Sequence, residues 1–328
     1  MRGVRVVLIR VAAALAFALV TVGALGALAA HGGRVSDRLD VAAHFAPLQL
    51  WMVLLGAGLV LATPRTGLRT ATTWMAAAGA PLALLLVWPE LTRAETRAPL
   101  TAEADVTLIQ FNVWGGWNAD VEGALDWLWA QDADVIVLQE VKPRVLEALE
   151  RRGGYHLTCE RRHRCQTLIL SRAAPLETGV PAVDEGAPVS SARATLPIGE
   201  DSFTVIGVHY TWPLPAGPQQ AQGRRVAALI GRFPKERTIV SGDFNSTPWS
   251  FSRRREDEAF GLERRTRMLF SWPAAAKEGR MIASPLPFLP IDQVYAGSDW
   301  RTVSVERGPR LGSDHYPVIV RLTLARGP

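Results

Sequence analysis

The chain has 328 residues and a formal net charge of +5. Most of that excess lies in residues 1–103, which hold nine arginines and five acids, so the remaining residues contain 27 basic and 26 acidic side chains. A nearly neutral C-terminal part exerts little long-range attraction on polyanions. The net charge therefore does not by itself predict a nucleic-acid-binding protein.

Three apolar segments open the chain, at residues 11–30, 44–62 and 71–89, and none contains Asp, Glu, Lys or Arg. Each is long enough to cross a hydrocarbon core of ~30 Å at ~1.5 Å per residue. We therefore predict an N-terminal membrane region, residues 1–89, with three transmembrane helices. The first segment has a second interpretation, a cleaved signal peptide, because it follows a basic start and ends near Ala27-Leu28-Ala29.

Basic residues predict the orientation of these segments. Arg2, Arg5 and Arg10 precede the first segment, and Arg65 and Arg69 lie in the loop between the second and third. Positive loops stay on the cytoplasmic side. The sequence thus predicts a multi-pass protein of the cell inner membrane, with the lipid bilayer as its partner and the rest of the chain extracytoplasmic. Nothing in the sequence indicates a protein partner.

Residues 90–104 alternate in charge and predict a linker, followed by a catalytic domain at residues 105–328. Because strands outnumber helices there, we expect an α/β (α+β) fold in which sheets are covered by helices. The predicted strands are residues 106–111, 135–139, 166–170, 193–196, 203–208, 238–241, 293–296 and 317–322. The predicted helices are residues 121–131, 144–152 and 219–232, whereas the basic run 253–255 is predicted to be a solvated loop.

Cys159 and Cys165 are the two cysteines of the chain, in the sequence CERRHRC. Their spacing suits a disulfide-closed loop in an exported domain. Free thiols are the main alternative. A metal site would need more Cys or His nearby.

Polar side chains follow or precede most of the predicted strands. A strand end is where a rigid scaffold can direct a side chain into a shared cleft. The set contains carboxylates, carboxamides and histidines: Asn112, Glu140, His209, Asp243, Asn245, Asp292, Asp314 and His315.

Oxygen ligands predict a hard cation. Glu140 and Asp314, with Asn112, match Mg²⁺, or Mn²⁺ in its place, which keeps several waters and binds phosphate oxygens. The sequence has no Cys-rich or three-His zinc pattern, no GxxxxGK[ST] phosphate loop and no GxSxG elbow. What remains is metal-assisted attack of water on phosphorus.

Six ordered motifs carry a family resemblance: IQFNVW, VLQE, GVHYTWP, SGDFNSTPWS, IDQVY and SDHYPV. Together they resemble the endonuclease/exonuclease/phosphatase superfamily, whose best-known fold is that of DNase I. The match covers roughly residues 106–322. The resemblance implies a four-layer α/β/β/α sandwich, with the active site at one end of the two sheets.

The resemblance also implies roles for the polar residues. Glu140 resembles the main metal ligand, with Asn112 and Asp314 completing or supporting its shell, and Asp243 resembles the carboxylate that positions and deprotonates water. Asn245 resembles its phosphate-binding partner. Asp292 resembles the acid that orients His315, which contacts the scissile phosphate. His209 resembles the histidine that stabilises developing charge or protonates the leaving oxygen.

The expected function is a Mg²⁺-dependent hydrolase of phosphate ester bonds at the outer face of the membrane. We expect a phosphodiesterase acting on nucleic acid or on phospholipid headgroups, and the alternative is a catalytically inert membrane receptor or interaction module that keeps the fold. The basic loop between the cysteines precedes a strand that borders the substrate cleft in the family. It therefore supplies candidate substrate contacts at Arg161, Arg162 and Arg164.

Overall fold

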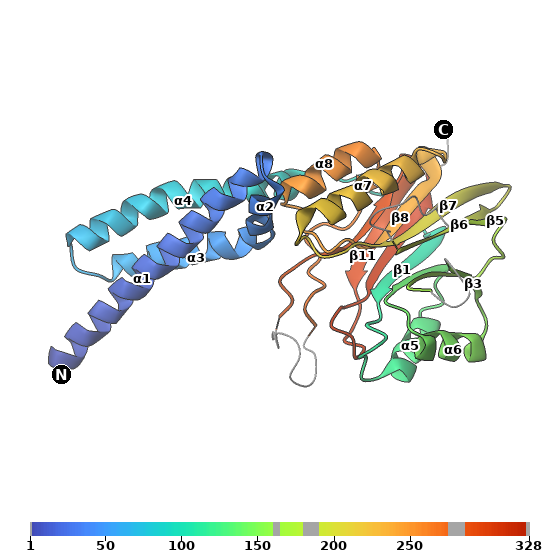
Figure 1. The fold of residues 1–328 in the computed structure, drawn as a ribbon, viewed down its shortest axis with the longest axis horizontal. Helices are drawn as coiled ribbons and strands as arrows, with labels where there is room; N and C mark the ends of the chain where they lie inside the picture. Colours follow the sequence, from blue (N-terminus) through green and yellow to red (C-terminus); the bar gives the residue numbers. More distant parts are fainter. Residues whose placement is uncertain (1, 160–164, 180–189, 275–285, 326–328) are drawn as a thin grey trace. The chain divides into compact units, whose positions relative to one another are not determined.

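The computed structural model describes residues 2–159, 165–179, 190–274 and 286–325. The chain forms two compact units, each treated separately below. The first, the helical unit, contains Met1–Arg93 together with Thr247–Arg254. The second, the sheet unit, contains Ala94–Ser246 and Arg255–Pro328. Figure 1 shows the elements of both, coloured along the chain.

Three long helices dominate the helical unit: α1 (Arg2–His31), α3 (Ala46–Leu61) and α4 (Gly67–Thr92). Between α1 and α3 lie the short helices η1 (Gly32–Arg34), α2 (Asp37–Asp40) and η2 (Val41–Phe45). Val4–Arg34, Asp37–Leu61 and Gly67–Thr92 are long and apolar enough to cross a membrane. Large apolar side chains such as Trp51 and Trp74 are exposed on them. An outward apolar surface of this kind is typical of helices surrounded by lipid.

Small residues let the three helices approach one another closely. A Cβ added at Gly56 would lie 2.7 Å from Val20 Cγ2, and one added at Gly79 would lie 2.6 Å from Ala24 Cβ. Both distances are too short for a real contact. Membrane helices pack through such small residues because lipid leaves little hydrophobic drive for association.

The segment Thr247–Arg254 packs within the helical unit through two buried polar residues. Asp40 accepts hydrogen bonds from the backbone N–H groups of Phe251 (2.7 Å) and Ser252 (2.8 Å). His44 pairs with Thr247 through Nδ1, at 3.0 Å to Oγ1 and 3.1 Å to the backbone N. Asp40 thus satisfies the free N–H groups at the start of α8 (Phe251–Phe260), as an N-cap residue would.

The expectation of a loop at residues 253–255 is wrong, although Arg255 is exposed to solvent as expected. These residues belong to α8, and Arg253 is only 1% exposed. The sequence predicted a loop because the run is highly charged and the acid that caps the start of α8 is not nearby in the sequence. Here that acid, Asp40, comes from more than 200 residues away along the chain.

Two six-stranded sheets lie in the described part of the sheet unit. Sheet A has the order β11-β12-β1-β2-β4-β3 and sheet B the order β5-β6-β7-β8-β10-β9. The strands of sheet A are β1 (Val106–Asn112), β2 (Val135–Gln139), β3 (His156–Cys159), β4 (Thr167–Ser171), β11 (Trp300–Arg307) and β12 (Val318–Leu324). Those of sheet B are β5 (Glu177–Gly179), β6 (Ser190–Ile198), β7 (Asp201–His209), β8 (Thr238–Asp243), β9 (Glu263–Arg264) and β10 (Asp292–Ala296).

Helices cover the outer face of each sheet, as Figure 1 shows. α5 (Val121–Ala130) and α6 (Pro143–Arg152) pack on sheet A through a cluster that includes Leu125 and Leu149. α7 (Ala216–Ile230) packs on sheet B, and η3 (Lys235–Arg237) precedes β8. In α6 the buried residues Val145, Ala148 and Leu149 recur at helical spacing, so one side of the helix is apolar and packs on the sheet.

The main core lies between the two sheets. Leu108 and Val137 of sheet A meet Val205 and Ile239 of sheet B in one cluster of fully buried side chains. Burying each such side chain contributes about 1.5–3 kcal/mol. The prediction of a mixed α/β fold with two packed sheets, preceded by three long apolar helices, is confirmed.

Candidate active site

Strand pairing brings the predicted polar residues to one end of the two sheets. In sheet A, β1 and β2 are parallel, with Asn112 opposite Gln139 and Glu140 immediately after it. In sheet B, β7 and β8 are parallel, with His209 opposite Asp243. β10 runs antiparallel to β8, so its first residue, Asp292, also lies opposite Asp243.

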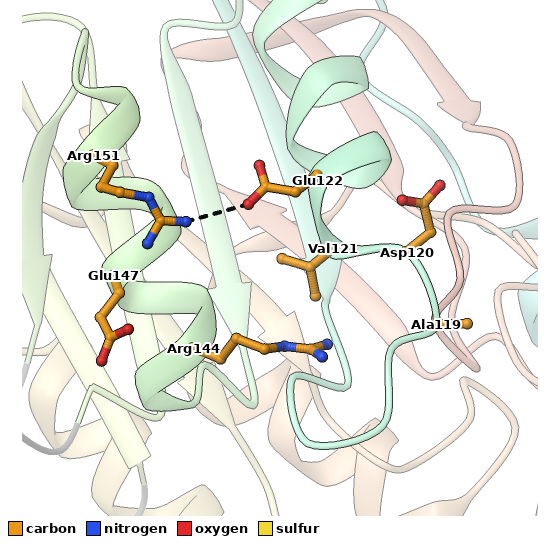
Figure 2. A pocket seen from close by; sticks show the side chains of 7 residues that line it. All are labelled: Ala119, Asp120, Val121, Glu122, Arg144, Glu147 and Arg151. Carbon is orange, nitrogen blue, oxygen red and sulfur yellow. Dashed lines mark hydrogen bonds and ion pairs between the residues drawn. The ribbon is translucent and has the colours of Figure 1, made fainter.

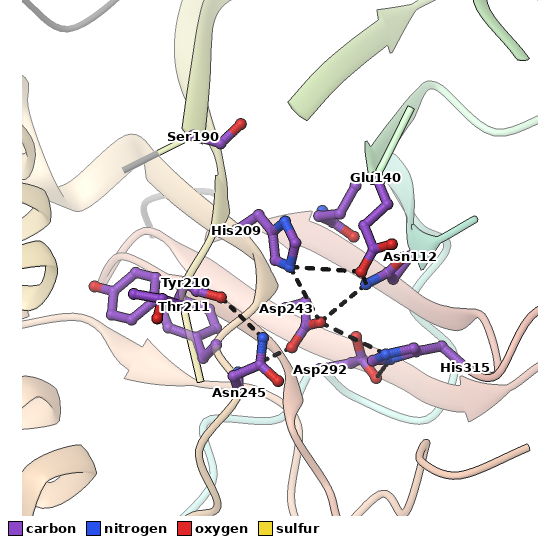
Figure 3. Close-up of polar contacts among 12 residues, drawn as sticks. Asn112, Glu140, Ser190, His209, Tyr210, Thr211, Asp243, Asn245, Asp292 and His315 are labelled. Atoms are coloured by element: carbon purple, nitrogen blue, oxygen red, sulfur yellow. Dashed lines mark hydrogen bonds and ion pairs between the residues drawn. The ribbon is translucent and has the colours of Figure 1, made fainter. Parts of the chain in front are cut away.

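Asp243 lies at the centre of this group (Figure 3). Asn112 donates through Nδ2 to Asp243 Oδ2 at 3.0 Å and to Glu140 Oε1 at 3.1 Å. His209 Nε2 is 3.7 Å from Asp243 Oδ2 and 3.9 Å from Glu140 Oε1. His315 Nε2 approaches the same Asp243 oxygen at 3.6 Å. Sheets A and B therefore contribute jointly to one cluster of acids, amide and imidazoles.

His315 and Asp292 form a hydrogen-bonded pair, with 2.8 Å between Nδ1 and Oδ2. Both side chains are almost fully buried. The loop before β12 is shaped by Ser313, whose Oγ accepts from His315 N at 3.1 Å and donates to Asn112 O at 2.7 Å. The acid thus sets the orientation of the imidazole, leaving Nε2 directed toward Asp243.

The loop after β8 is held in a special conformation. The backbone N–H of Asn245 donates to Asp243 Oδ1 at 2.9 Å, and its side-chain Nδ2 donates to Tyr210 O at 2.8 Å. Asn245 and Glu140 both have positive φ, 48° and 54°. Residues other than glycine rarely adopt this region, and such backbone strain concentrates at functional sites.

Burial and charge shift the protonation of two groups. Burial raises the pKa of Asp243 to about 6, although the neighbouring His315 acts in the opposite direction. Burial lowers the pKa of His315, but the carboxylates of Asp292, Asp243 and Asp314 outweigh it and leave that pKa well above 6.5. The site therefore favours an imidazolium beside a carboxylate whose pKa lies close to neutral.

The donor chemistry of the cluster fits a divalent cation. Asp243, Asp292 and His315 offer ligand atoms that all lie within 4.8 Å of one another. Glu140 adds a third carboxylate, partly exposed, beside Asp243. Buried acids at such short range carry an uncompensated negative charge, which a cation relieves. These groups could thus hold a metal ion, and their oxygens suit a hard one.

The predicted metal ligands Glu140, Asn112 and Asp314 differ in their surroundings. Glu140 and Asn112 are hydrogen-bonded to each other, with the amide NH₂ of Asn112 facing the acids. The carboxylate of Asp314 has a different partner, because it accepts a hydrogen bond from Trp272 Nε1 at 3.1 Å. That the three form one ligand set stays a prediction.

Sequence reasoning missed Ser313 and Trp272, which hold His315 and Asp314. Trp272 belongs to a region where no motif was recognised, so only the folded structure reveals its contact. Ser313 directly precedes Asp314 and His315, and a hydroxyl before a polar pair is a typical turn residue. That local signal could have identified Ser313.

The remaining predicted sites are the basic loop and the two cysteines that flank it. Arg161, Arg162 and Arg164 fall outside the described residues. Cys159 and Cys165, which flank them, are joined in a disulfide.

A separate pocket of about 280 Å³ lies at the start of α5 (Figure 2). Its lining contains none of the predicted site residues. Two of its acids have local partners, because Asp120 accepts from the backbone N–H of Gly123 in α5 and Glu122 pairs with Arg151. The pocket therefore shows no group that is set up for chemistry.

Comparisons with known proteins identify the fold and the family of this chain. A search of curated protein sequences finds no significant match. Among solved structures, a functionally unknown conserved protein from Enterococcus faecalis V583 is 16% identical, with a TM-score of 0.55 over 67% of this chain and 100% of its own. D. rerio TDP2 complexed with a single-strand DNA product is 17% identical, with a TM-score of 0.54 over 66% of this chain and 98% of its own. Bacteroides thetaiotaomicron VPI-5482 mannosyl-6-phosphatase Bt3783 is 15% identical, with a TM-score of 0.51 over 67% of this chain and 100% of its own.

At these identities the structural matches show a shared fold. The family assignment comes from a sequence model of the Endonuclease/Exonuclease/phosphatase family, which matches residues 109–315. That range begins in β1 and ends at His315, so it contains every residue of the cluster around Asp243. The chain therefore belongs to the Endonuclease/Exonuclease/phosphatase family, whose members are metal-dependent and hydrolyse phosphate esters.

Proposed function

We propose that this protein is a Mg²⁺-dependent phosphodiesterase that hydrolyses nucleic acid or phospholipid headgroup esters by in-line attack of water. The cluster around Asp243 carries this proposal, because it combines a buried carboxylate, an oriented imidazole and a second carboxylate at one sheet edge. Phosphate ester hydrolysis needs those parts: a base for water and cationic or hydrogen-bonding groups for the phosphate.

Asp243 is the proposed base. Its pKa of about 6 is close to neutral pH, and a general base is most effective when its pKa lies near the working pH. Its two oxygens are already oriented, one by the backbone N–H of Asn245 and the other by Asn112. Asn245 is the proposed phosphate-binding partner, through the side-chain N–H that is not donated to Tyr210 O.

The pair of Asp292 and His315 is the proposed phosphate-binding arm. Asp292 holds Nδ1 of His315, so the imidazolium presents Nε2 to a negatively charged oxygen. His209, on the adjacent strand β7, is the proposed group that stabilises or protonates the leaving oxygen. Both imidazoles lie within 4 Å of the same Asp243 oxygen, which makes that oxygen the focus of the site.

The proposed metal is Mg²⁺, or Mn²⁺ in its place, held by Glu140 with Asn112 and Asp314. When bound, such an ion neutralises charge on a phosphate and polarises its bond to phosphorus.

Two structural neighbours and the N-terminal helices bear on the class of substrate. The TDP2 structure contains a single-strand DNA product, and the B. thetaiotaomicron protein is named a mannosyl-6-phosphatase, so the fold accommodates unlike phosphate esters. The apolar helices favour a substrate at the membrane, and the near-neutral charge of residues 104–328 gives no preference for polyanions.

A simple assay tests the proposed chemistry. The full chain in detergent should hydrolyse bis(p-nitrophenyl) phosphate with Mg²⁺ or Mn²⁺, and EDTA should stop the reaction until metal is restored. Glu140→Ala should need more Mg²⁺ for half-maximal rate, whereas Glu150→Ala, an exposed acid on α6, should match the wild type. Hydrolysis that persists in EDTA, or a wild type without hydrolysis, would exclude the proposal.

The products then distinguish the substrates. Plasmid DNA, RNA, sphingomyelin and phosphatidylinositol phosphates should be compared under the same conditions. Release of a phosphorylated headgroup from vesicles would support the lipid substrate, and shortened nucleic acid would support the other.

We also propose that the sheet unit lies on the outer, extracytoplasmic side of the cell inner membrane. Three spans that begin with a cytoplasmic N-terminus deliver the following residues to the opposite side, and the arginine distribution supports that start. A periplasm-active reporter fused after Pro328 should therefore be active, and a cytoplasm-active reporter at the same place should be silent. The reverse pattern would contradict this orientation.

A further inference from the structure

Gln110 is a buried amide within the core between the two sheets. It lies on β1 between Leu108 and Asn112, in the alternation that directs these three residues to the inter-sheet side, while Ile109 and Phe111 join the cluster under α5 and α6. Its side chain is 0% exposed. An amide buried among Val and Leu side chains costs free energy unless its hydrogen bonds are made.

The hydrogen bonds of Gln110 cross from one sheet to the other. Its Nε2 donates to Asp292 Oδ1 of sheet B at 2.8 Å and to Gln139 Oε1 of sheet A at 2.8 Å. Gln139 and Asp292 are also 0% exposed. The two N–H bonds of one buried amide thus link the strand that precedes Glu140 to the acid that holds His315.

The acceptor-only character of Asp292 fixes which way the amide of Gln110 points. An ionised carboxylate cannot donate, so Gln110 must present its NH₂ to Asp292. Its second N–H then faces Gln139, which accepts the hydrogen bond through Oε1. This direction leaves Gln110 Oε1 and Gln139 Nε2 buried without a hydrogen-bond partner among the described residues, so it is set by the carboxylate of Asp292.

Asp292 is held at both of its oxygens. Oδ1 receives Gln110 and Oδ2 receives His315 Nδ1, each at 2.8 Å. With only His315 attached, the carboxylate could rotate about its last side-chain bond and the imidazole would follow it. With Gln110 also attached, such a rotation breaks a buried charge-assisted hydrogen bond.

We propose that Gln110, oriented by Gln139, is a positioning residue that fixes Asp292 and through it the direction of His315 Nε2. The expected fall in kcat rests on the proposed function, whereas the expected change in the position of His315 does not. Gln110 touches neither the expected position of the phosphate nor Asp243. It acts through another residue, as groups behind a ligand or catalytic side chain commonly do.

Gln110→Met is the main test, because methionine fills a similar volume and removes both donors. In the full chain in detergent, kcat for bis(p-nitrophenyl) phosphate should fall by about 10–100-fold, the range seen for groups that support functional side chains. KM should change by less than about threefold, because loss of orientation affects the transition state more than substrate binding.

A spectroscopic measurement follows the position of His315 directly. With ¹⁵N-labelled histidine, the Nδ1–H proton of His315 should give a downfield signal, assigned by its loss in His315→Gln. In Gln110→Met this signal should shift or broaden. The matched control is Thr238→Val, which removes a partly buried hydrogen bond to Pro234 O at the start of β8, at the opposite end of that strand from Asp243. It should leave the signal and kcat unchanged.

Gln110→Asn provides a second variant that stays polar if Gln110→Met does not fold. Its amide is one methylene shorter, so it should lose the bond to Asp292 and reproduce the signal change with a smaller fall in kcat. An unchanged His315 signal in the folded variant would overturn the inference, as would an equal fall in kcat for Thr238→Val. If the wild type proves inactive, the proposed function fails, and the His315 signal alone decides the role of Gln110.

Discussion

Asp243→Asn should lower kcat for phosphodiester hydrolysis by about 10²–10⁴-fold, the usual contribution of a general base. The substitution keeps the shape of the side chain and its acceptance from Asn245 N–H, but it removes the group that takes a proton from water. The rate should be measured at saturating Mg²⁺ and saturating substrate, so that weaker binding does not enter. Asp126→Asn, an exposed acid on α5, should keep wild-type kcat.

The same substitution should stabilise the metal-free protein, which separates lost chemistry from lost folding. The pKa of Asp243 in the folded state is about 6, above its ordinary 3.8, so the folded protein binds a proton more tightly than the unfolded chain does. Stability therefore falls as pH rises from about 4 to about 6, by up to about 3 kcal/mol for a shift of about two pKa units. Asparagine resembles the neutral acid and avoids that loss.

Thermal unfolding in EDTA, followed by tryptophan fluorescence, checks this sign. The midpoint of Asp243→Asn should exceed that of the wild type at pH 8, and the difference should shrink at pH 4.5. An Asp243→Asn protein with near-wild-type kcat would remove Asp243 from the proposed chemistry. A variant that is less stable at both pH values would show that Asp243 supports the fold rather than burdening it.

Sequence reasoning predicted most of the site because its residues follow apolar runs. Asn112, Glu140, His209 and Asp243 each stand at the end of a strand, and β-strands that end at one edge bring their next residues together. Asp292 was predicted at the start of a strand, which works because β10 is antiparallel to β8. The pattern thus predicted that these side chains would lie together, and their roles in an active site stay a proposal.

Gln110 escaped prediction for the opposite reason. It lies inside the apolar run of β1, where a single amide does not interrupt the strand pattern, and its partners Gln139 and Asp292 come from other strands. Contacts between sheets depend on how the sheets are stacked, which strand periodicity does not encode.

Parts of the fold were missed where polar residues hide the strand pattern. β11 carries Arg301, Glu306 and Arg307, and it forms an edge of sheet A. Edge strands use such charged side chains because their free backbone groups would otherwise pair with another chain. The same charges make an edge strand look like a loop in the sequence.

Asp292→Asn and His315→Gln should each lower kcat by about 10²–10⁴-fold, and the double variant should lose little more than the worse single one. The two side chains share one buried hydrogen bond of 2.8 Å and act on the substrate through a single imidazole. Once that imidazole is misdirected or absent, the remaining partner has nothing to contribute. His156→Gln, an exposed histidine on β3, is the matched control and should leave kcat unchanged.

The pH profile of Asp292→Asn adds a directional check. In the wild type, the acids around His315 keep its pKa well above 6.5, so a rate that needs imidazolium is lost only as pH rises through that raised pKa. Without the charge of Asp292 the pKa of His315 falls, and the alkaline limb of the remaining activity should move to lower pH. If the two single losses multiply in the double variant and the limb stays in place, Asp292 and His315 act independently, and the proposed phosphate-binding arm must be assigned to other residues.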